Sequence, residues 1–333
     1  MTNIAILGAH SFSGSTLINF FQQRNISVIG FARKRSSDKT FLPFLDGQSM
    51  SSQKTEVIES NLITDFNLIA HTLIEKKVEI VFNFAAQSMV AESWNKPEDW
   101  YDVNVSSFSK LLGLISLNKK SRIRKFVQFS TPEVYGSTVG LMGESWNFNP
   151  TTPYAISRSA GDLHLRALNQ AFGFPVVFTR TANIYGKNQK LYRLIPKLIV
   201  QILKGQKFEL HGGGKSVRAF IHSDDVAEAL WKVMQNGQIG DTYHISSENF
   251  ISIFDLVNLI LEKLNASFDK HIITHEERTG KDQAYLLDSG KIRRELGWAD
   301  KVTLEKGIDQ VINWVMENWI KIKDMNVNYI HSR

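Results

Sequence analysis

Short apolar runs alternate with longer segments of helical period along the first half of the chain. Runs rich in β-branched and aromatic residues are expected to form strands at Ile4–Leu7, Val28–Phe31, Ile80–Phe84, Phe126–Phe129 and Val176–Phe178. Apolar residues recur at helical spacing between several of these runs, in Phe66–Lys77, Trp100–Asn118 and Tyr154–Phe172. This alternation predicts an α/β fold built on a Rossmann-type, doubly wound parallel sheet. Because such sheets bind ligands beyond the carboxyl ends of their strands, functional side chains are expected just after the apolar runs.

The second half of the chain is less regular. Helix-like segments occur at Tyr192–Lys204, Ile253–Leu264 and Leu304–Trp319, with glycine-rich turns between them. We therefore expect a first domain at 1–182, joined by part of 217–246, and a smaller C-terminal α/β lobe at 183–333. The final stretch, about 323–333, carries no pattern and is expected to form a loose tail.

Composition narrows the class of protein. The 333 residues are 43% hydrophobic and 22% charged, and none is cysteine, which excludes disulfides and thiolate metal sites. Met1 leads directly into a strand-like run, and no apolar run approaches the roughly 20 residues that span a bilayer. We expect a cytoplasmic protein with no membrane segment. The nine histidines show no metal-binding spacing such as His-Glu-x-x-His, so no metal is expected.

The net charge of +6 has two interpretations. Nucleic-acid binding would need a basic patch, whereas the basic clusters here are short and scattered. A pocket for an anionic ligand with several phosphates fits the sequence better, and no nucleic-acid partner is expected.

The first strand-like run is followed by a glycine-containing turn, GAHSFSGS. Gly8 suits a tight turn, and Gly14 would let the next helix lie close to the strand. Backbone N–H groups of Ser11, Phe12 and Ser13 would then face a pyrophosphate at the start of the helix. Ser11 stands where a middle glycine is usual, and its hydroxyl could donate to a phosphate. The alternative is a plain turn between a strand and a helix.

A basic turn follows the second strand-like run, in the stretch GFARKRSS. NAD-binding folds place an acidic residue here, against the ribose hydroxyls. This chain has Arg33, Lys34, Arg35 and Ser36 instead, groups that suit a 2′-phosphate. The turn favours NADP over NAD, and the alternative is a solvated basic loop.

Three further segments complete a pattern: NFAAQS (83–88), STPEVYG (130–136) and TPYAISR (152–158). With the opening turn and the later stretches RTANIYG, LHGGGKSVRAFIHSDDV and EERTGKDQAYLLDSGKIRRELGW, they resemble the extended short-chain dehydrogenase/reductase family. The nearest branch is the nucleotide-sugar 4,6-dehydratases. The resemblance runs in order from about residue 3 to residue 300.

The candidate catalytic residues make chemical sense on their own. Tyr154 and Arg158 lie four apart and share one face of a helix, where a fixed cation would lower the pKa of the phenol. Tyr154 is then a plausible acid/base group. The family normally has lysine at position 158. The resemblance implies that Thr131 binds the 4-hydroxyl of the sugar and that Glu133 removes the C5 proton. Pro132 stands where relatives have aspartic acid or serine.

The resemblance also implies ligand contacts. It places adenine beside Asn61 and Leu62, and the cofactor along Ala85, Ala86 and Gln87, with Tyr154 and Arg158 at the nicotinamide end. Residues matching substrate contacts are Ser88, Thr131, Asn183, Lys197, Arg218 and Arg278.

These features predict an enzyme that dehydrates a nucleotide-diphosphate sugar. It would oxidise C4, eliminate water across C5 and C6 and return the hydride to C6, with NADP as cofactor and NAD as the alternative. GDP is favoured as the nucleotide by the basic turn, and dTDP, CDP and UDP stay open. Members of the family commonly pair, so a homodimer is expected. Pro132 favours an alternative, an epimerase or oxidoreductase on the same fold, whereas Ser11 and Arg158 favour a non-catalytic NADP-binding sensor.

Overall fold

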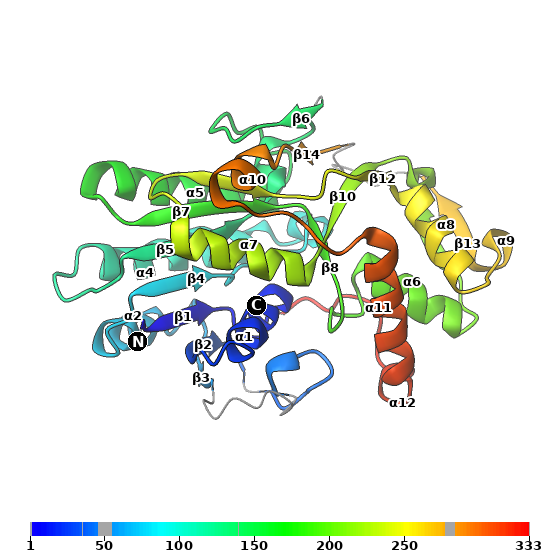
Figure 1. The fold of residues 1–333 in the computed structure, drawn as a ribbon, viewed down its shortest axis with the longest axis horizontal. Coiled ribbons are helices and arrows are strands. Elements are labelled where there is room, and N and C mark those ends of the chain that lie inside the picture. The colour runs from blue at the N-terminus through cyan, green and yellow to red at the C-terminus, as the bar shows by residue number, and fades with distance from the viewer. Residues whose placement is uncertain (1, 35, 46–54, 139, 277–283, 333) are drawn as a thin grey trace.

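A parallel sheet of seven strands forms the centre of the larger lobe (Figure 1). The computed structural model describes residues 2–34, 36–45, 55–138, 140–276 and 284–332. In spatial order the strands are β3 (Glu56–Glu59), β2 (Val28–Ala32), β1 (Ile4–Leu7), β4 (Ile80–Asn83), β5 (Lys125–Ser130), β7 (Val176–Thr181) and β11 (Thr242–Ile245). All neighbouring strands are parallel, and the order reverses direction between β1 and β4, which confirms the predicted Rossmann-type sheet.

Helices cover both faces of this sheet. One face carries α1 (Phe12–Gln22) and α7 (Ser223–Asn236), and the other carries α2 (Phe66–Glu75), α4 (Phe108–Ser116) and α5 (Pro153–Phe172). The side chains of Leu17, Phe82, Leu111, Phe126 and Leu165 are fully buried between the layers. Burying one such side chain stabilises the fold by about 1.5–3 kcal/mol, so both faces are firmly packed.

The predicted helix Trp100–Asn118 is divided in the structure. It begins as α3 (Pro97–Tyr101), widens into a π-helical turn at Asp102–Ser107, and continues as α4. The side-chain oxygen of Asn104, inside the wide turn, accepts from the backbone N–H of Gln87, and its amide donates to the Gln87 carbonyl and to Ser157. The turn thereby ties the loop after β4 to α5.

The second lobe contains smaller sheets and the remaining helices. Its sheets pair β8 (Asn183–Tyr185) with β10 (Val217–His222) and β12 (Phe250–Ser252), and β9 (Phe208–His211) with β13 (Ile272–His275). A separate two-stranded sheet pairs β6 (Leu141–Met142) with β14 (Leu286–Leu287) and packs against Val134 and Tyr135. The helices of the second lobe are α6 (Leu194–Leu203), α8 (Ile253–Lys263), α9 (Phe268–His271), α11 (Leu304–Glu317) and α12 (Trp319–Ile322). Leu198, Val257 and Val311 lie in their shared apolar core. The chain returns to the first lobe through β11 and α10 (Gly290–Leu296), after which Trp298 packs into the core beside α7.

Two local expectations need correction. β3 was not predicted, because it is an edge strand with an exposed glutamate at each end and only two partly buried residues between them. The expected loose tail is wrong for the residues that the structure describes, since Asn328, His331 and Ser332 all make hydrogen bonds to distant parts of the chain. Among the described helices, none combines the length and the apolar character needed to cross a membrane.

Candidate active site at the carboxyl edge of the sheet

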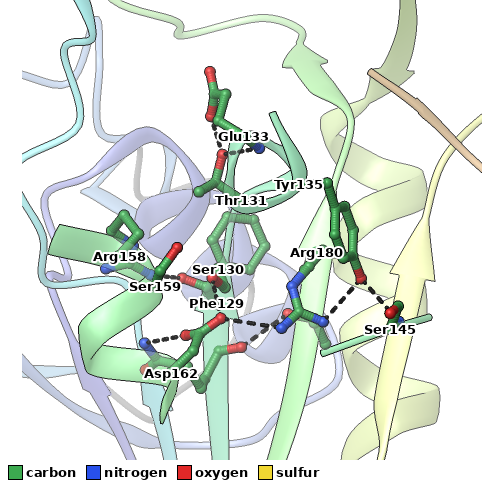
Figure 2. Close-up of polar contacts among 12 residues, drawn as sticks. Phe129, Ser130, Thr131, Glu133, Tyr135, Ser145, Arg158, Ser159, Asp162 and Arg180 are labelled. Atoms are coloured by element: carbon green, nitrogen blue, oxygen red, sulfur yellow. Dashed lines mark hydrogen bonds and ion pairs between the residues drawn. The ribbon is translucent and has the colours of Figure 1, made fainter. Parts of the chain in front are cut away.

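The chain makes a tight turn immediately after β5, and this turn carries two candidate catalytic residues. Thr131 caps a short 3₁₀ helix, Pro132–Tyr135, and its hydroxyl oxygen accepts from the backbone N–H of Glu133. The same hydroxyl donates to the Glu133 carboxylate (Figure 2). Pro132 suits the first position of this helix because its missing N–H is not needed there. The sequence TPE therefore holds a hydroxyl and a carboxylate together at the end of the strand.

Tyr154 approaches the same place from α5. Thr152 caps α5 by accepting from the Ala155 N–H, and Pro153 occupies the first helical position, so Tyr154 lies in the first turn. Its side chain is 8% exposed. Burial and, to a smaller extent, the nearby Glu133 carboxylate raise the pKa of Tyr154 to about 12, although Arg158, a hydrogen bond with Thr131 and Arg193 act to lower it. Tyr154, Thr131 and Glu133 thus form one coupled group.

Arg158 has the expected direction of effect on the pKa of Tyr154, but the net pKa is raised rather than lowered. Arg158 does favour the phenolate, but burial outweighs it in the protein alone. Arg158 is 5% exposed, and its guanidinium donates to the carbonyl of Phe129 on β5 (Figure 2). Its charge is therefore partly engaged by the main chain.

A buried ionic network beneath these residues was not foreseen. The Arg180 guanidinium on β7 lies 3.3 Å from the Asp162 carboxylate on α5, and both side chains are fully buried. Arg180 also donates to the hydroxyl of Tyr135, at the end of the Glu133 turn (Figure 2). Burial lowers the pKa of His244 to about 3, so its neutral ring can pair with the Tyr135 hydroxyl at 2.8 Å. The network links α5, which carries Tyr154, to the turn that carries Glu133.

The turn after β1 has the close approaches of a pyrophosphate cradle. Gly8 has φ +81°, and a Cβ there would lie 2.9 Å from the Ala85 nitrogen. A Cβ on Gly14 would lie 2.4 Å from the carbonyl oxygen of Gly8. Ser11 caps α1 by accepting from the Gly14 N–H at 3.0 Å, which leaves its hydroxyl proton for another acceptor. Ser11, where a glycine was expected, therefore acts as the N-cap of α1, and Phe12 and Ser13 are the first residues of this helix. The residues at the start of α1 fit a dinucleotide phosphate.

Gly14→Ala tests this cradle. The added methyl group must displace backbone, so we expect the Kd for a nicotinamide dinucleotide to rise at least about tenfold and stability to fall by about 1–3 kcal/mol. Calorimetric titration and thermal unfolding measure both effects. Gly113→Ala is the matched control, because nothing lies within 4 Å of a Cβ at that helical position. Equal dinucleotide affinity in the two variants would contradict the assignment.

The basic turn after β2 lies at the same edge of the sheet. Arg33, Lys34 and Ser36 are exposed, and Arg35 lies outside the described residues. The Arg33 guanidinium donates to the main-chain carbonyl of Ser332 at 2.9 Å, a contact that the sequence pattern did not suggest.

The other expected cofactor residues follow β3 and β4. The side chain of Asn61 accepts from the Ile63 N–H and forms a turn, and Leu62 is buried in the core. Ala85 donates from its backbone to Asn83. Ala86 follows it in the same loop, and Gln87, which is 6% exposed, is held there by Asn104.

The expected substrate residues that the structure describes contact other side chains of the chain. Asn183, at the start of β8, accepts from the Tyr285 hydroxyl at 3.2 Å, and the guanidinium of the buried Arg218 stacks 4.2 Å from the centre of the Tyr285 ring. Ser88 accepts from Arg193, which was not among the expected residues although its charge also acts on Tyr154. Lys197 on α6 donates to Asn328, and Arg278 lies outside the described residues.

No group of three or more histidine, aspartate or glutamate side chains in the described part of the chain is placed to hold a metal ion. The stretch HGGGKS forms the turn between β9 and β10, as a 3₁₀ helix at Gly212–Gly214.

Comparison with known proteins gives consistent matches. Residues 5–311 match the model of a family described as GDP-mannose 4,6 dehydratase. The chain is 32% identical to a dTDP-D-glucose 4,6-dehydratase of Homo sapiens, over 79% of this chain and 76% of that protein. It is 30% identical over 95% of its length to a trifunctional UDP-glucose 4,6-dehydratase/UDP-4-keto-6-deoxy-D-glucose 3,5-epimerase/UDP-4-keto-L-rhamnose-reductase of Arabidopsis thaliana. The chain spans 47% of that relative, about half its length.

The fold matches as well as the sequence. A solved structure of DesIV, a dTDP-glucose 4,6-dehydratase from Streptomyces venezuelae with NAD and TYD bound, superposes with a TM-score of 0.86 at 28% identity. The match covers 95% of this chain and 98% of that chain. The family that the sequence motifs resembled is thereby confirmed. The chain belongs to the nucleotide-sugar 4,6-dehydratases of the extended short-chain dehydrogenase/reductase family.

Proposed function

We propose that this chain converts a nucleotide-diphosphate hexose to its 4-keto-6-deoxy derivative with a bound nicotinamide dinucleotide. The observation that carries the proposal is the convergence of Thr131, Glu133 and Tyr154 after β5, on the sheet edge that also carries the Gly8–Gly14 cradle. Relatives that match most of this chain are described as 4,6-dehydratases. When bound, the cofactor supplies a positively charged ring that accepts a hydride from C4 and returns it to C6.

Tyr154 accepts the proton of the sugar 4-hydroxyl. Its phenolate oxygen takes the proton from the 4-hydroxyl as C4 becomes a ketone. In the protein alone the raised pKa keeps Tyr154 protonated at neutral pH. A bound positively charged ring at the nicotinamide end would act with Arg158 to lower this pKa and so raise the fraction of phenolate.

Glu133 carries out the proton transfers that eliminate water across C5 and C6. The ketone at C4 makes the C5 proton acidic, and the Glu133 carboxylate removes it. Pro132 has no proton to give, so the newly protonated Glu133 delivers the same proton to the 6-hydroxyl, and the C6–O bond breaks to release water. The proton held by Tyr154 later returns to C5, which balances the reaction. The Thr131 hydroxyl, which donates to Glu133, keeps the carboxylate in position for both transfers.

Product analysis tests the function. Purified protein given each nucleotide-diphosphate hexose in deuterated water should yield a product lighter than its substrate by one water, with deuterium at C5. Substrate consumed without loss of water would favour the alternative that Pro132 suggests, an epimerase or oxidoreductase.

NADP is the proposed cofactor. NAD is the alternative, because the solved structure of the relative DesIV contains NAD. Arg33, Lys34 and Ser36 present cationic and hydroxyl groups where an adenosine 2′-phosphate would lie, at the end of β2. Asn61, Leu62 and the loop Ala85–Gln87 would hold the rest of the dinucleotide, with Tyr154 and Arg158 at its nicotinamide end.

Arg33→Ala tests the cofactor preference. We expect NADP⁺ affinity to fall about tenfold while NAD⁺ affinity changes less than about twofold, because only the former has the 2′-phosphate. Titration of both cofactors measures the ratio, and Arg122→Ala, at an exposed position far along the sequence, is the control. An unchanged ratio of NADP⁺ to NAD⁺ affinity would mean that the cofactor is NAD or that another residue binds the 2′-phosphate.

The sugar nucleotide and the assembly are also proposals. GDP is the proposed nucleotide, which the matching family description supports, and competition among GDP, dTDP, UDP and CDP for binding tests it. The substrate would contact Ser88, Thr131, Asn183, Lys197, Arg218 and Arg278 and occupy the lobe at 183–333, opposite the dinucleotide-binding domain at 1–182 with part of 217–246. The proposed location is the cytoplasm. A homodimer is proposed because α4, its C-cap and α5 expose the apolar side chains of Leu114, Leu117, Ile156 and Leu163. Sedimentation would measure the mass of the assembly.

A further inference from the structure

The last described segment of the chain, Val327–Ser332, crosses from the second lobe to the carboxyl edge of the large sheet (Figure 1). Val327 is buried in the core of the second lobe, whereas Ser332 contacts Arg33 and Gln87. We call this stretch the C-terminal segment. Nothing in its sequence pattern indicated such a position.

The C-terminal segment is anchored along its length by side chains. The Asn328 side-chain oxygen accepts from Lys197 at 2.9 Å. The Tyr329 ring packs edge-on against Tyr192, with ring centres 5.1 Å apart. These contacts fasten the segment to the second lobe.

His331 fastens it to the first lobe. Its ring stacks on Trp100, with ring centres 4.9 Å apart and planes 10° from parallel. Its Nε2 lies 2.8 Å from the Asp99 carboxylate. Because Trp100 and Asp99 belong to α3, this anchor lies outside the residues expected to touch the cofactor.

Ser332, at the tip, meets residues that the cofactor is expected to use. Its main-chain carbonyl oxygen accepts from Arg33 and from the side-chain amide of Gln87, each at 2.9 Å. Arg33 also reaches the Ser332 hydroxyl at 3.4 Å. One oxygen therefore takes hydrogen bonds from a guanidinium after β2 and an amide after β4, on either side of β1.

We propose that the C-terminal segment belongs to the cofactor site, where the Ser332 carbonyl competes with cofactor oxygens for Arg33 and Gln87. This rests on the proposed cofactor role of those two residues. A carbonyl oxygen bridging two donors takes the place that a phosphate oxygen would take. Dinucleotide binding then requires Ser332 to withdraw, and NADP, whose 2′-phosphate needs Arg33, competes more directly than NAD. The C-terminal segment therefore lowers the affinity for the cofactor and affects the choice between NADP and NAD.

Hydrogen exchange on the unaltered protein, freed of nucleotide, shows whether the C-terminal segment is displaced by the cofactor or closes over it. If Ser332 is displaced, amide exchange across the C-terminal segment should rise when saturating NADP⁺ is added, whereas exchange in the Gly8–Ser15 turn should fall. Slower or unchanged exchange in the segment would overturn the proposal, since the segment would then close over the cofactor or lie apart from it.

Release of the anchors provides a second test. The double variant Tyr329→Ala/His331→Ala removes both ring contacts without altering Arg33 or Gln87. We expect it to bind NADP⁺ about three- to tenfold more tightly, with a smaller gain for NAD⁺. Ile330→Ala is the matched control, because this neighbouring side chain is 72% exposed. Weaker or unchanged NADP⁺ binding in the double variant would overturn the proposal.

Failure of the cofactor assignment itself gives a different result. If Arg33 does not bind the 2′-phosphate, Arg33→Ala leaves the ratio of NADP⁺ to NAD⁺ affinity unchanged in the otherwise unaltered chain. If only the segment's role is wrong, Arg33→Ala changes this ratio but the double variant does not tighten binding.

Discussion

Tyr154→Phe is expected to lower kcat by about 10³-fold. The substitution removes only the hydroxyl that would take the proton from the sugar, and the phenyl ring still fills a site that is 8% exposed. Steady-state and single-turnover measurements of the 4-keto product would give the loss. Tyr101→Phe makes the same chemical change at a tyrosine that is 37% exposed, and it should retain full activity.

The raised pKa of Tyr154 adds a pH dependence to this prediction. A group that must be deprotonated to act, with a pKa above the working pH, gives a rate that rises as the pH rises. We expect kcat/KM to increase across neutral pH in the unaltered enzyme and to lose this slope in Tyr154→Phe. A slope that survives the substitution would show that another group takes the proton.

Glu133→Gln is expected to lower formation of the 4-keto-6-deoxy product by about 10²- to 10⁴-fold. The amide keeps the size of the side chain and can still bond to Thr131, but it cannot remove the C5 proton. The proposed mechanism predicts more than slow turnover, because it assigns both proton transfers to the Glu133 carboxylate. Washout of deuterium or tritium from C5 of the substrate should stop together with loss of water.

The control for this prediction is Glu98→Gln, at an exposed position of α3. It should preserve both washout and product formation. If Glu133→Gln retained C5 washout but not loss of water, another group would be the base, and Glu133 would act only on the leaving hydroxyl.

Much of the fold could be predicted from the sequence because its local patterns are strong. β1 has the predicted bounds, and α5 begins at a threonine cap followed by proline and ends at a glycine with φ +68°. The π-helical turn could not be predicted, since Asn104 shapes it through contacts with Gln87 and Ser157, which are distant in sequence. β3 was missed because an edge strand does not need a continuous apolar run.

The candidate site divides in the same way. Thr131, Glu133 and Tyr154 lie in short motifs at element ends, so their positions followed from the alternation of strands and helices. The net effect on the Tyr154 pKa did not follow, because burial depends on the whole packed structure and outweighs the charge of Arg158. Arg193 and Ser332 were missed because each meets the site through the fold rather than through a motif.

The position of Ser332 has a practical consequence for handling the protein. A purification handle or fused domain attached on the carboxyl side of Ser332 would pull the Ser332 carbonyl away from Arg33 and Gln87. Asn3, by contrast, contacts the loop before β4 at the amino edge of the sheet, on the opposite side. Handles at the amino end should leave cofactor affinity as it is in the untagged chain, whereas handles at the carboxyl end should change it.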